Sequence, residues 1–413
     1  MDPTRLPILP ADILLPRPGA DLSRWAVVAC DQYTSQPEYW RAVEDYVGGA
    51  PSALNIVYPE VYLSEGEARI RRIQAEMQKY LENGTLVPAV KNGFIYLERT
   101  TPAGVRPGLV VLLDLESYDF TPGADVPVRA TEGTILERIP PRVKIRRGAP
   151  LESPHVMVLL DDPGCTVIEP LQAQTAALRP LYDFELMQGG GHLTGWAVEG
   201  EQVRRTLAAL EALFETSGGF LAAVGDGNHS LATARQCWLD LRERIPERER
   251  ARHPARYALK ELNNLHAPAL VFEPIHRVLT GVDPADVQER FADWCAERGA
   301  ALEAGSEITW VQGGEETGAR IAHAPNPLPV AVLQPFLDDY LKARPGAEID
   351  YIHGADVVRQ LAQKDGALGI LLQPIDKASL FPAIRQGGVL PRKTFSMGEA
   401  FEKRYYMECR RIL

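Results

Sequence analysis

The stretch FLAAVGDGNHSLATARQCW, residues 220–238, carries the clearest indication of the fold. The apolar run FLAAV predicts a short buried strand. After it, Leu231, Ala234, Trp238 and Leu241 recur at the spacing of a helix that packs one apolar face against a sheet. The intervening GDGNH is therefore expected to form a strand-to-helix turn, the connection typical of α/β architectures.

This turn carries groups that suit an oxyanion. The first N–H groups of a helix have no helical partner, and the helix dipole places positive charge beside them. Gly225 and Gly227 would let a ligand approach the backbone, while Asn228, His229 and Ser230 add side-chain donors. The alternative is an ordinary capped turn, because Asp, Asn and Gly are common at helix starts and in turns. The chain contains no G-x-x-x-x-G-K-[ST] phosphate loop.

The composition is that of a globular protein with a sizeable core. The 413 residues are 45% hydrophobic and 24% charged, and the formal net charge is -11. An acidic balance disfavours nucleic-acid binding, which depends on Lys and Arg. The five scattered cysteines form no C-x-x-C pair, and there is no signal-peptide pattern or long apolar run. We therefore expect a cytoplasmic protein that contacts neither nucleic acid nor membrane, with a homo-oligomer left open.

Length and local composition predict three segments. Residues 1–126 form an N-terminal α/β segment, residues 127–273 a central segment with the RATEGT and DGNHS motifs, and residues 274–413 a C-terminal α/β segment. Together they predict a mixed α/β (α+β) fold with a mixed sheet flanked by helices.

Two helix starts and two strands are predicted in detail. SEGEARIRRIQAEMQKYLENG is expected to be a helix with Ser64 as its N-cap, and GFIYLERT and GLVVLLDLESY are expected to be strands. In the C-terminal segment, Asp283 is the expected cap of a helix that begins at Pro284.

The stretch RATEGTILERIPPRVKIR is dense in charge and supplies candidate anion ligands. Glu132 is the candidate acid–base carboxylate, and a surface strand with paired charges is the alternative. The candidate phosphate ligands are Arg129, Thr131, Arg138 and Arg142.

Other candidates follow turns or strand ends. Lys393 and Thr394 follow a turn and suit a phosphate, although an exposed strand-edge Lys is equally compatible. Asp31, Tyr33 and His353 lie at predicted strand ends, where α/β sheets often face ligands, and a capped turn is the alternative for His353. His192 belongs to the Gly-rich stretch GGGHLTGW, which could cradle a phosphate or be a plain flexible connection. The candidate substrate contacts are Asp31, Tyr33, His192 and His353. No dedicated metal site is expected, because the eight histidines form no H-x-x-x-H pair.

Five stretches resemble the domain of unknown function 1015 family of bacteria and archaea. They lie between residues 129 and 397 and read RATEGTILERIPPR, SPHVMVLLDDP, VGDGNHSLATA, DYIHG and LPRKTFSM. The shorter DGNHSLATA also resembles the DG-x-H-R-x-x-A signature of the ParB/sulfiredoxin-like superfamily, which includes free-serine kinases. Ser230 stands where that signature has Arg, so a cation is expected from elsewhere.

The expected activity is a phosphotransferase that uses ATP or ADP with Mg²⁺ on a small hydroxyl-bearing metabolite. Serine as the acceptor is implied only by the superfamily resemblance. Asn228, His229 and backbone N–H groups would hold phosphate oxygens, and Glu132 or Asp226 would accept the hydroxyl proton.

Two other functions are compatible with the same residues. One is a regulatory module that binds nucleotide without turnover. The other is a metal-assisted hydrolase built on Asp161, Asp162, Asp226 and His229.

Overall fold

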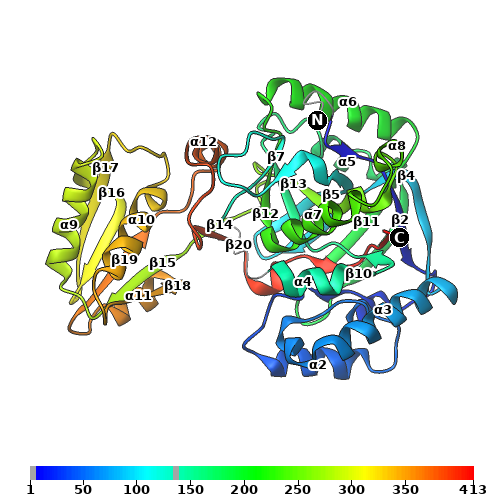
Figure 1. The fold of residues 1–413 in the computed structure, drawn as a ribbon, viewed down its shortest axis with the longest axis horizontal. Helices are drawn as coiled ribbons and strands as arrows, with labels where there is room; N and C mark the ends of the chain where they lie inside the picture. The colour runs from blue at the N-terminus through cyan, green and yellow to red at the C-terminus, as the bar shows by residue number, and fades with distance from the viewer. Residues whose placement is uncertain (1–5, 134–138) are drawn as a thin grey trace. The chain divides into compact units, whose positions relative to one another are not determined.

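The computed structural model describes residues 6–133 and 139–413, which form two compact units (Figure 1). The first unit comprises the described residues of 6–130, 139–270 and 399–413, and the second comprises 131–133 and 271–398. The last stretch of the chain therefore belongs to the first unit, although it follows the second in sequence. Both units combine sheets with helices, which confirms the α/β fold class.

The first unit is built on a large mixed sheet. Its strands are β1 Ile8–Leu9, β2 Ala11–Pro16, β4 Leu86–Thr101, β5 Gly104–Asp114, β6 Tyr118–Asp119, β7 Val128–Ala130, β9 Met157–Leu160, β10 Arg179–Glu185, β11 His192–Val198, β12 Ala222–Asp226 and β13 Tyr257–Asn264. The order is β10-β11-β4-β5-β13-β9-β12-β7-β6, with β1 beside β5 and β2 beside β4. The predicted strand GFIYLERT lies within β4, and GLVVLLDLESY lies in β5 as far as Asp114; β4 and β5 are antiparallel. Strand β12 lies antiparallel to β9 and parallel to β7.

Short strand pairs join the chain's last residues to earlier segments of the first unit. They are β3 Val27–Val28 with β21 Tyr405–Tyr406, and β8 Leu151–Glu152 with β22 Arg410–Arg411. These pairings bring residues near 405 beside the loop that follows β3.

The helices of the first unit include the predicted one after residue 64, but its start differs. Residues Glu60–Glu65 form the 3₁₀ helix η2, so α3 begins at Gly66 and Ser64 is not its N-cap. The helices are α1 Leu22–Trp25, α2 Pro37–Val47, α3 Gly66–Glu82, α4 Ile139–Arg146, α5 Glu169–Gln172, α6 Glu201–Thr216, α7 Asn228–Arg242 and α8 Glu247–Arg250, with 3₁₀ helices η1 Ala53–Asn55, η3 Leu115–Ser117, η5 Thr175–Ala177, η6 Pro254–Arg256 and η7 Ala400–Glu402.

The predicted strand-to-helix turn is confirmed at β12 and α7. Leu231, Ala234 and Trp238 are buried on one face of α7, as their spacing predicts. Helix α4 packs against α7 through Val143 and Ala232.

The second unit has its own sheet, with strand order β17-β16-β19-β15-β18. Asp283 caps α9 by accepting a hydrogen bond from Ala285 N at 3.0 Å, as predicted. The strands are β14 Phe272–Pro274, β15 His276–Thr280, β16 Ala301–Gln312, β17 Glu315–Ala322, β18 Glu348–Ile352, β19 Ala367–Leu372 and β20 Phe395–Met397; the helices are α9 Pro284–Ala296, α10 Pro329–Lys342, α11 Ala355–Leu361 and α12 Lys377–Gly387. Across the described parts of both units, every helix is too short or too polar to cross a bilayer.

Candidate functional site

The turn between β12 and α7 has a backbone conformation that glycine permits. Gly227 has a φ of 82°, in the left-handed region that disfavours residues with a Cβ. A Cβ there would also lie 2.8 Å from Cγ2 of Val156. Asp226 precedes it as the last residue of β12, and its Oδ1 accepts a hydrogen bond from Gly227 N at 2.9 Å. The glycine therefore lets the chain turn sharply from the strand into the helix.

The N-terminus of α7 carries the predicted donors. The N–H groups of Ser230 and Leu231 donate to Gly227 O at 3.0 and 3.1 Å, so the helical hydrogen bonds begin there. The N–H groups of Asn228 and His229 come before these bonds, at the positive end of the helix dipole. Asn228, His229 and Ser230 are all partly exposed. This end of the helix can therefore reach a ligand from solvent.

A lysine from the end of the chain lies at this turn. Nζ of Lys403 lies 3.4 Å from Oδ2 of Asp226, and the two side chains are 12% and 22% exposed. Ser230 carries no charge at this turn, whereas Lys403 places a positive charge beside Asp226.

Two buried arginines hold the segment that carries Lys403. Nη2 of Arg99 donates to Phe401 O at 2.9 Å, and Nη2 of Arg106 donates to Glu402 O at 3.1 Å. Both arginines are almost fully buried, and they face each other across β4 and β5. The position of Lys403 is therefore fixed by the central sheet.

A histidine and a tyrosine lie close to the same turn. Nδ1 of His155 and the hydroxyl of Tyr406 are 2.9 Å apart, and Cys30 N donates to that hydroxyl oxygen at 3.3 Å. The Tyr406 hydroxyl and Nδ1 of His155 share one hydrogen bond, in which the donor is set by the tautomer of the imidazole.

The charges around His155 connect two predicted site residues. Burial lowers the pKa of His155, the negative charges of Asp31 and Asp226 oppose this, and Lys260 and Arg404 add to the lowering. Asp31 and Asp226 are far apart in sequence, yet both act on one imidazole. The structure thus brings these two predicted residues into one electrostatic neighbourhood.

Arg142 lies beside the same loop and is paired. Its Nη2 forms an ion pair with Glu60, and both side chains are mostly buried. Burial raises the pKa of the Cys30 thiol to about 12; the charges of Asp31 and Glu60 reinforce this, while Tyr406 and Arg142 oppose it. Arg142 therefore contributes positive charge near Asp31 while bound to Glu60.

Tyr33 extends this loop with an aromatic surface. It has a φ of 55° and stacks on Tyr39 with ring centroids 3.7 Å apart. Burial and the charge of Glu399 raise the pKa of Tyr33. The loop that carries Asp31 and Tyr33 therefore lies near the segment that leads to Lys403.

Two predicted residues of the first unit have structural partners. Arg129, in β7, donates to Asp125 at 2.6 Å and lies 4.5 Å from the centre of the Phe220 ring. His192, in β11, bonds to the carboxylates of Asp183 and Glu185 on β10, and these bonds raise its pKa. Arg129 and His192 are thus each bound to carboxylates of neighbouring residues of the first unit.

The RATEGT and LPRKT motifs meet in the second unit. Leu390 N donates to Thr131 O at 2.7 Å, and Glu132 forms an isolated bridge with Leu390. Thr394 is buried, and its Oγ1 donates to Pro391 O at 2.5 Å. The hydroxyl of Thr394 is therefore directed to its own turn.

Lys393 and His353 are exposed in this unit. Lys393 has a φ of 59°, and its carbonyl oxygen accepts from Nη2 of the fully buried Arg277 at 2.9 Å. His353 lies close enough to His276 to contribute, after burial and Arg277, to lowering the pKa of His276. Arg138 lies outside the described residues.

The set of residues expected for a metal-assisted hydrolase does not converge. In the antiparallel pair, Asp226 lies opposite Met157, at the start of β9, whereas Asp161 and Asp162 follow Leu160 at its other end. That separation is about 10 Å or more at 3.3 Å per residue. The part of the chain that the structure describes also contains no group of three or more His, Cys, Asp or Glu side chains arranged for a metal ion.

The residues missed from sequence are His155, Tyr406, Lys403 and Glu60. His155 lies in the quoted stretch SPHVMVLLDDP, directly before a buried strand, which was a usable signal. Lys403 and Tyr406 carry no local pattern, because only the return of the chain to the first unit places them here.

Comparisons with known proteins identify one matching family and several solved structures with low sequence identity to this chain. The family model described as "Protein of unknown function (DUF1015)" matches residues 11–336. No curated protein sequence matches the chain significantly.

The similar solved structures share little sequence with it. A free serine kinase in complex with AMP has a TM-score of 0.37 and 11% identity, over 73% of this chain and 92% of that one. SbnI from Staphylococcus aureus, truncated at its C-terminus, has a TM-score of 0.35 and 9% identity, over 70% and 83%. A conserved hypothetical protein from Pyrococcus furiosus has a TM-score of 0.33 and 10% identity, over 72% and 90%.

Proposed function

The chain belongs to the DUF1015 family, and we propose that this member is a nucleotide-dependent phosphotransferase acting on a small hydroxyl-bearing metabolite, such as a free amino acid. The observation that carries the proposal is the pairing of Lys403 with Asp226 at the partly exposed start of α7. A cation, a carboxylate and a helix N-terminus there combine phosphate binding with a proton acceptor.

Phosphate oxygens would lie against the start of α7. The N–H groups at this helix end and the helix dipole favour negative charge. Lys403 adds a full positive charge 3.4 Å from Asp226, so it can exchange that partner for a phosphate oxygen. Its limited exposure reduces screening by solvent.

Asp226 would act on the acceptor. The acceptor hydroxyl oxygen forms a bond to the transferred phosphorus, and the bond from phosphorus to the bridging oxygen of the nucleotide breaks. The hydroxyl proton passes to the Asp226 carboxylate, and the negative charge leaves on the nucleotide. His155, whose Nδ1 bonds to Tyr406, lies in the same neighbourhood, and its lowered pKa favours the neutral imidazole.

Mg²⁺ would accompany the nucleotide. Mg²⁺ in such sites is commonly held by one or two carboxylates together with substrate phosphates and water. Asp31, whose charge acts on the same imidazole as that of Asp226, would supply a carboxylate while Asp226 accepts the proton. The ion would neutralise charge on the phosphates.

The test is a product assay with matched variants. The full-length protein is incubated with ATP or ADP, Mg²⁺ and a panel of hydroxyl-bearing metabolites headed by serine, and phosphorylated product is detected by mass spectrometry. We expect product with the wild type and about 10²–10⁴-fold slower product formation with Asp226→Asn. Asp339→Asn is the control, because Asp339 forms an exposed pair with Lys342 in the second unit. Failure to form product from any acceptor contradicts the proposal.

Calorimetry separates the regulatory alternative. Nucleotide binding that is weakened by Lys403→Met, without product from any acceptor, would identify a nucleotide-binding module instead.

A further inference from the structure

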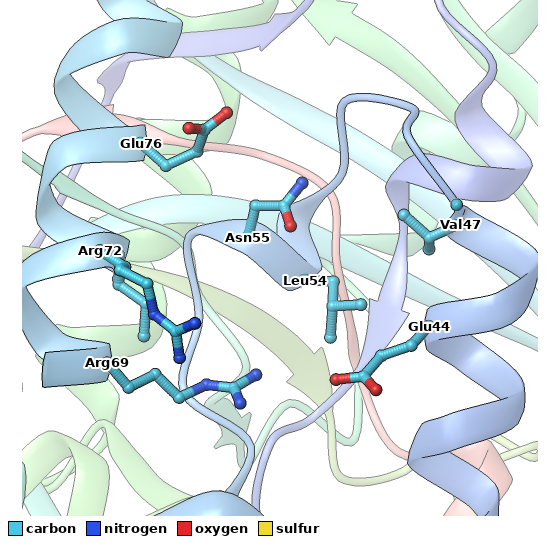
Figure 2. A pocket seen from close by; sticks show the side chains of 9 residues that line it. Glu44, Val47, Leu54, Asn55, Arg69, Arg72 and Glu76 are labelled. Atoms are coloured by element: carbon cyan, nitrogen blue, oxygen red, sulfur yellow. The ribbon is translucent and has the colours of Figure 1, made fainter. Parts of the chain in front are cut away.

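A pocket in the first unit lies between α2, η1 and α3 and has opposite charges on facing walls (Figure 2). Its volume is about 380 Å³. Arg69 and Arg72 extend from α3, and Glu44 extends toward them from α2. None of the residues that line this pocket has a role in the proposed phosphotransfer.

Both arginines of this wall pair with Glu65; Arg69 is mostly buried, whereas the side chain of Arg72 is 69% exposed. Nη1 of Arg69 lies 2.7 Å from Oε1 of Glu65, and its guanidinium lies 4.0 Å from the centre of the Tyr62 ring. Nη2 of Arg72 lies 2.5 Å from the other oxygen of Glu65. One carboxylate is thus shared by two guanidinium groups, so this trio carries a net positive charge. The side chain of Arg69 is only 13% exposed, which limits the entropy lost on binding an anion.

The facing wall offers acceptors. Glu44 is exposed, and burial, a hydrogen bond with Glu44 and the negative charge of Glu44 raise the pKa of Tyr62 to about 12. Nδ2 of Asn55 donates to the hydroxyl of Tyr80 at 3.0 Å, so its Oδ1 is left as an acceptor on the pocket wall. Among the described residues, no ion pair joins Glu44 to Arg69, so a ligand can lie between them.

Part of the pocket lining is apolar. Val47, Leu54 and Ile73 line it and are all buried. Glu76, the remaining charged residue of the wall, is paired with Lys79 at 2.9 Å. A ligand therefore meets donors on one side, acceptors on the other and a small apolar surface.

We infer that this pocket binds a small zwitterion of the α-amino acid class. Its carboxylate would take the two guanidinium groups of Arg69 and Arg72, because planar guanidinium donors match a carboxylate. Its ammonium would lie between Glu44 and Asn55, and an apolar side chain would cover Leu54. This site is separate from the Lys403–Asp226 pair and does not depend on the proposed phosphotransfer.

Calorimetric titration of the full-length protein with L-alanine and L-leucine tests the inference. We expect both to bind, whereas acetate and methylamine, each with one of the two charges, bind at least about tenfold more weakly. Arg72→Met and Glu44→Gln should each weaken leucine binding about tenfold or more. Arg71→Met and Glu38→Gln are controls, because Arg71 is an exposed residue of α3 paired with Glu67 and Glu38 is exposed on α2.

Variants also separate this site from the proposed active site. Leucine binding should persist in Asp226→Asn, whose loss of phosphotransfer concerns only the other proposal. Arg69→Lys keeps the positive charge but loses the planar set of guanidinium donors. This variant should bind leucine more weakly while retaining the wild-type fold by circular dichroism. The inference would be overturned if neither L-alanine nor L-leucine bound. It would also be overturned if Arg72→Met and Glu44→Gln bound leucine as tightly as the wild type.

Discussion

The turns after β9 and β12 both contain Asp and Gly, but their carboxylates have different partners. Asp162 is buried and accepts hydrogen bonds from Thr166 N at 2.6 Å, Thr166 Oγ1 at 3.1 Å and Val167 N at 2.9 Å. Asp226 accepts one local bond and pairs with Lys403, which lies far along the chain. A carboxylate whose bonds close its own loop stabilises the fold, whereas one paired with a distant cation at an accessible helix start can exchange that partner for a ligand.

The largest expected effect lies at Asp226. Asp226→Asn keeps the size and the local bond from Gly227 but removes the proton acceptor. We predict that turnover falls by about 10²–10⁴-fold. Product formation by mass spectrometry measures it, and circular dichroism should show an unchanged fold. Full activity in this variant would contradict a catalytic role for Asp226 and leave it no different in function from Asp162.

The second prediction is that a change at Asp162 lowers stability but not turnover, the opposite of the change at Asp226. Asp162→Ala leaves the buried N–H groups of Thr166 and Val167 without their acceptor, so the free energy of unfolding should fall by about 1–3 kcal/mol. Urea denaturation measures this loss. Turnover of the folded fraction should stay at the wild-type level, and a selective loss of turnover would contradict the structural role.

The third prediction uses the lowered pKa of His155. A histidine whose pKa is lower in the folded state contributes stability that is present above its unfolded pKa, about 6.5, and is lost as the pH falls. We expect His155→Gln to flatten the acid side of the stability profile. Denaturation midpoints measured between about pH 5 and pH 8 check it. An unchanged slope would show that His155 is not held neutral.

The smallest effect is expected at His192, with the opposite sign. Asp183 and Glu185 raise its pKa, so its contribution is present below about pH 6.5 and is lost as the pH rises. Its side chain is 35% exposed, so solvent screening makes this contribution small. The same pH series of denaturation midpoints should show His192→Gln slightly less stable than the wild type at acid pH. The two proteins should have the same stability once the pH has risen past the pKa of His192. A pH-dependent change in stability larger than that of His155→Gln would contradict this ranking of the two histidines.

The sequence was informative where local patterns determine structure. The apolar spacing of α7 and the Asp283 cap of α9 both predict elements that the structure contains. Ser64 failed as a cap because the residues before Gly66 already form a 3₁₀ helix, which local capping rules do not anticipate.

The candidate site was only partly predictable for a physical reason. Asp31 and Asp226 were identified because each follows an apolar run, and both act on His155. Lys403 and Tyr406 reach the site because β21 pairs with β3 after the chain has formed the second unit. No local spacing encodes such a long-range pairing, so composition and periodicity could not reveal it.

The most direct measurement is a calorimetric titration of Mg²⁺–ATP into the wild type, Lys403→Met and Asp162→Ala. We predict that Lys403→Met binds about tenfold or more weakly, because it loses a charge-assisted phosphate contact. Asp162→Ala, measured where it is folded, should bind like the wild type. Equal affinities of the wild type and Lys403→Met, or no binding by either, would contradict the assignment of the Asp226–Lys403 turn as the phosphate site.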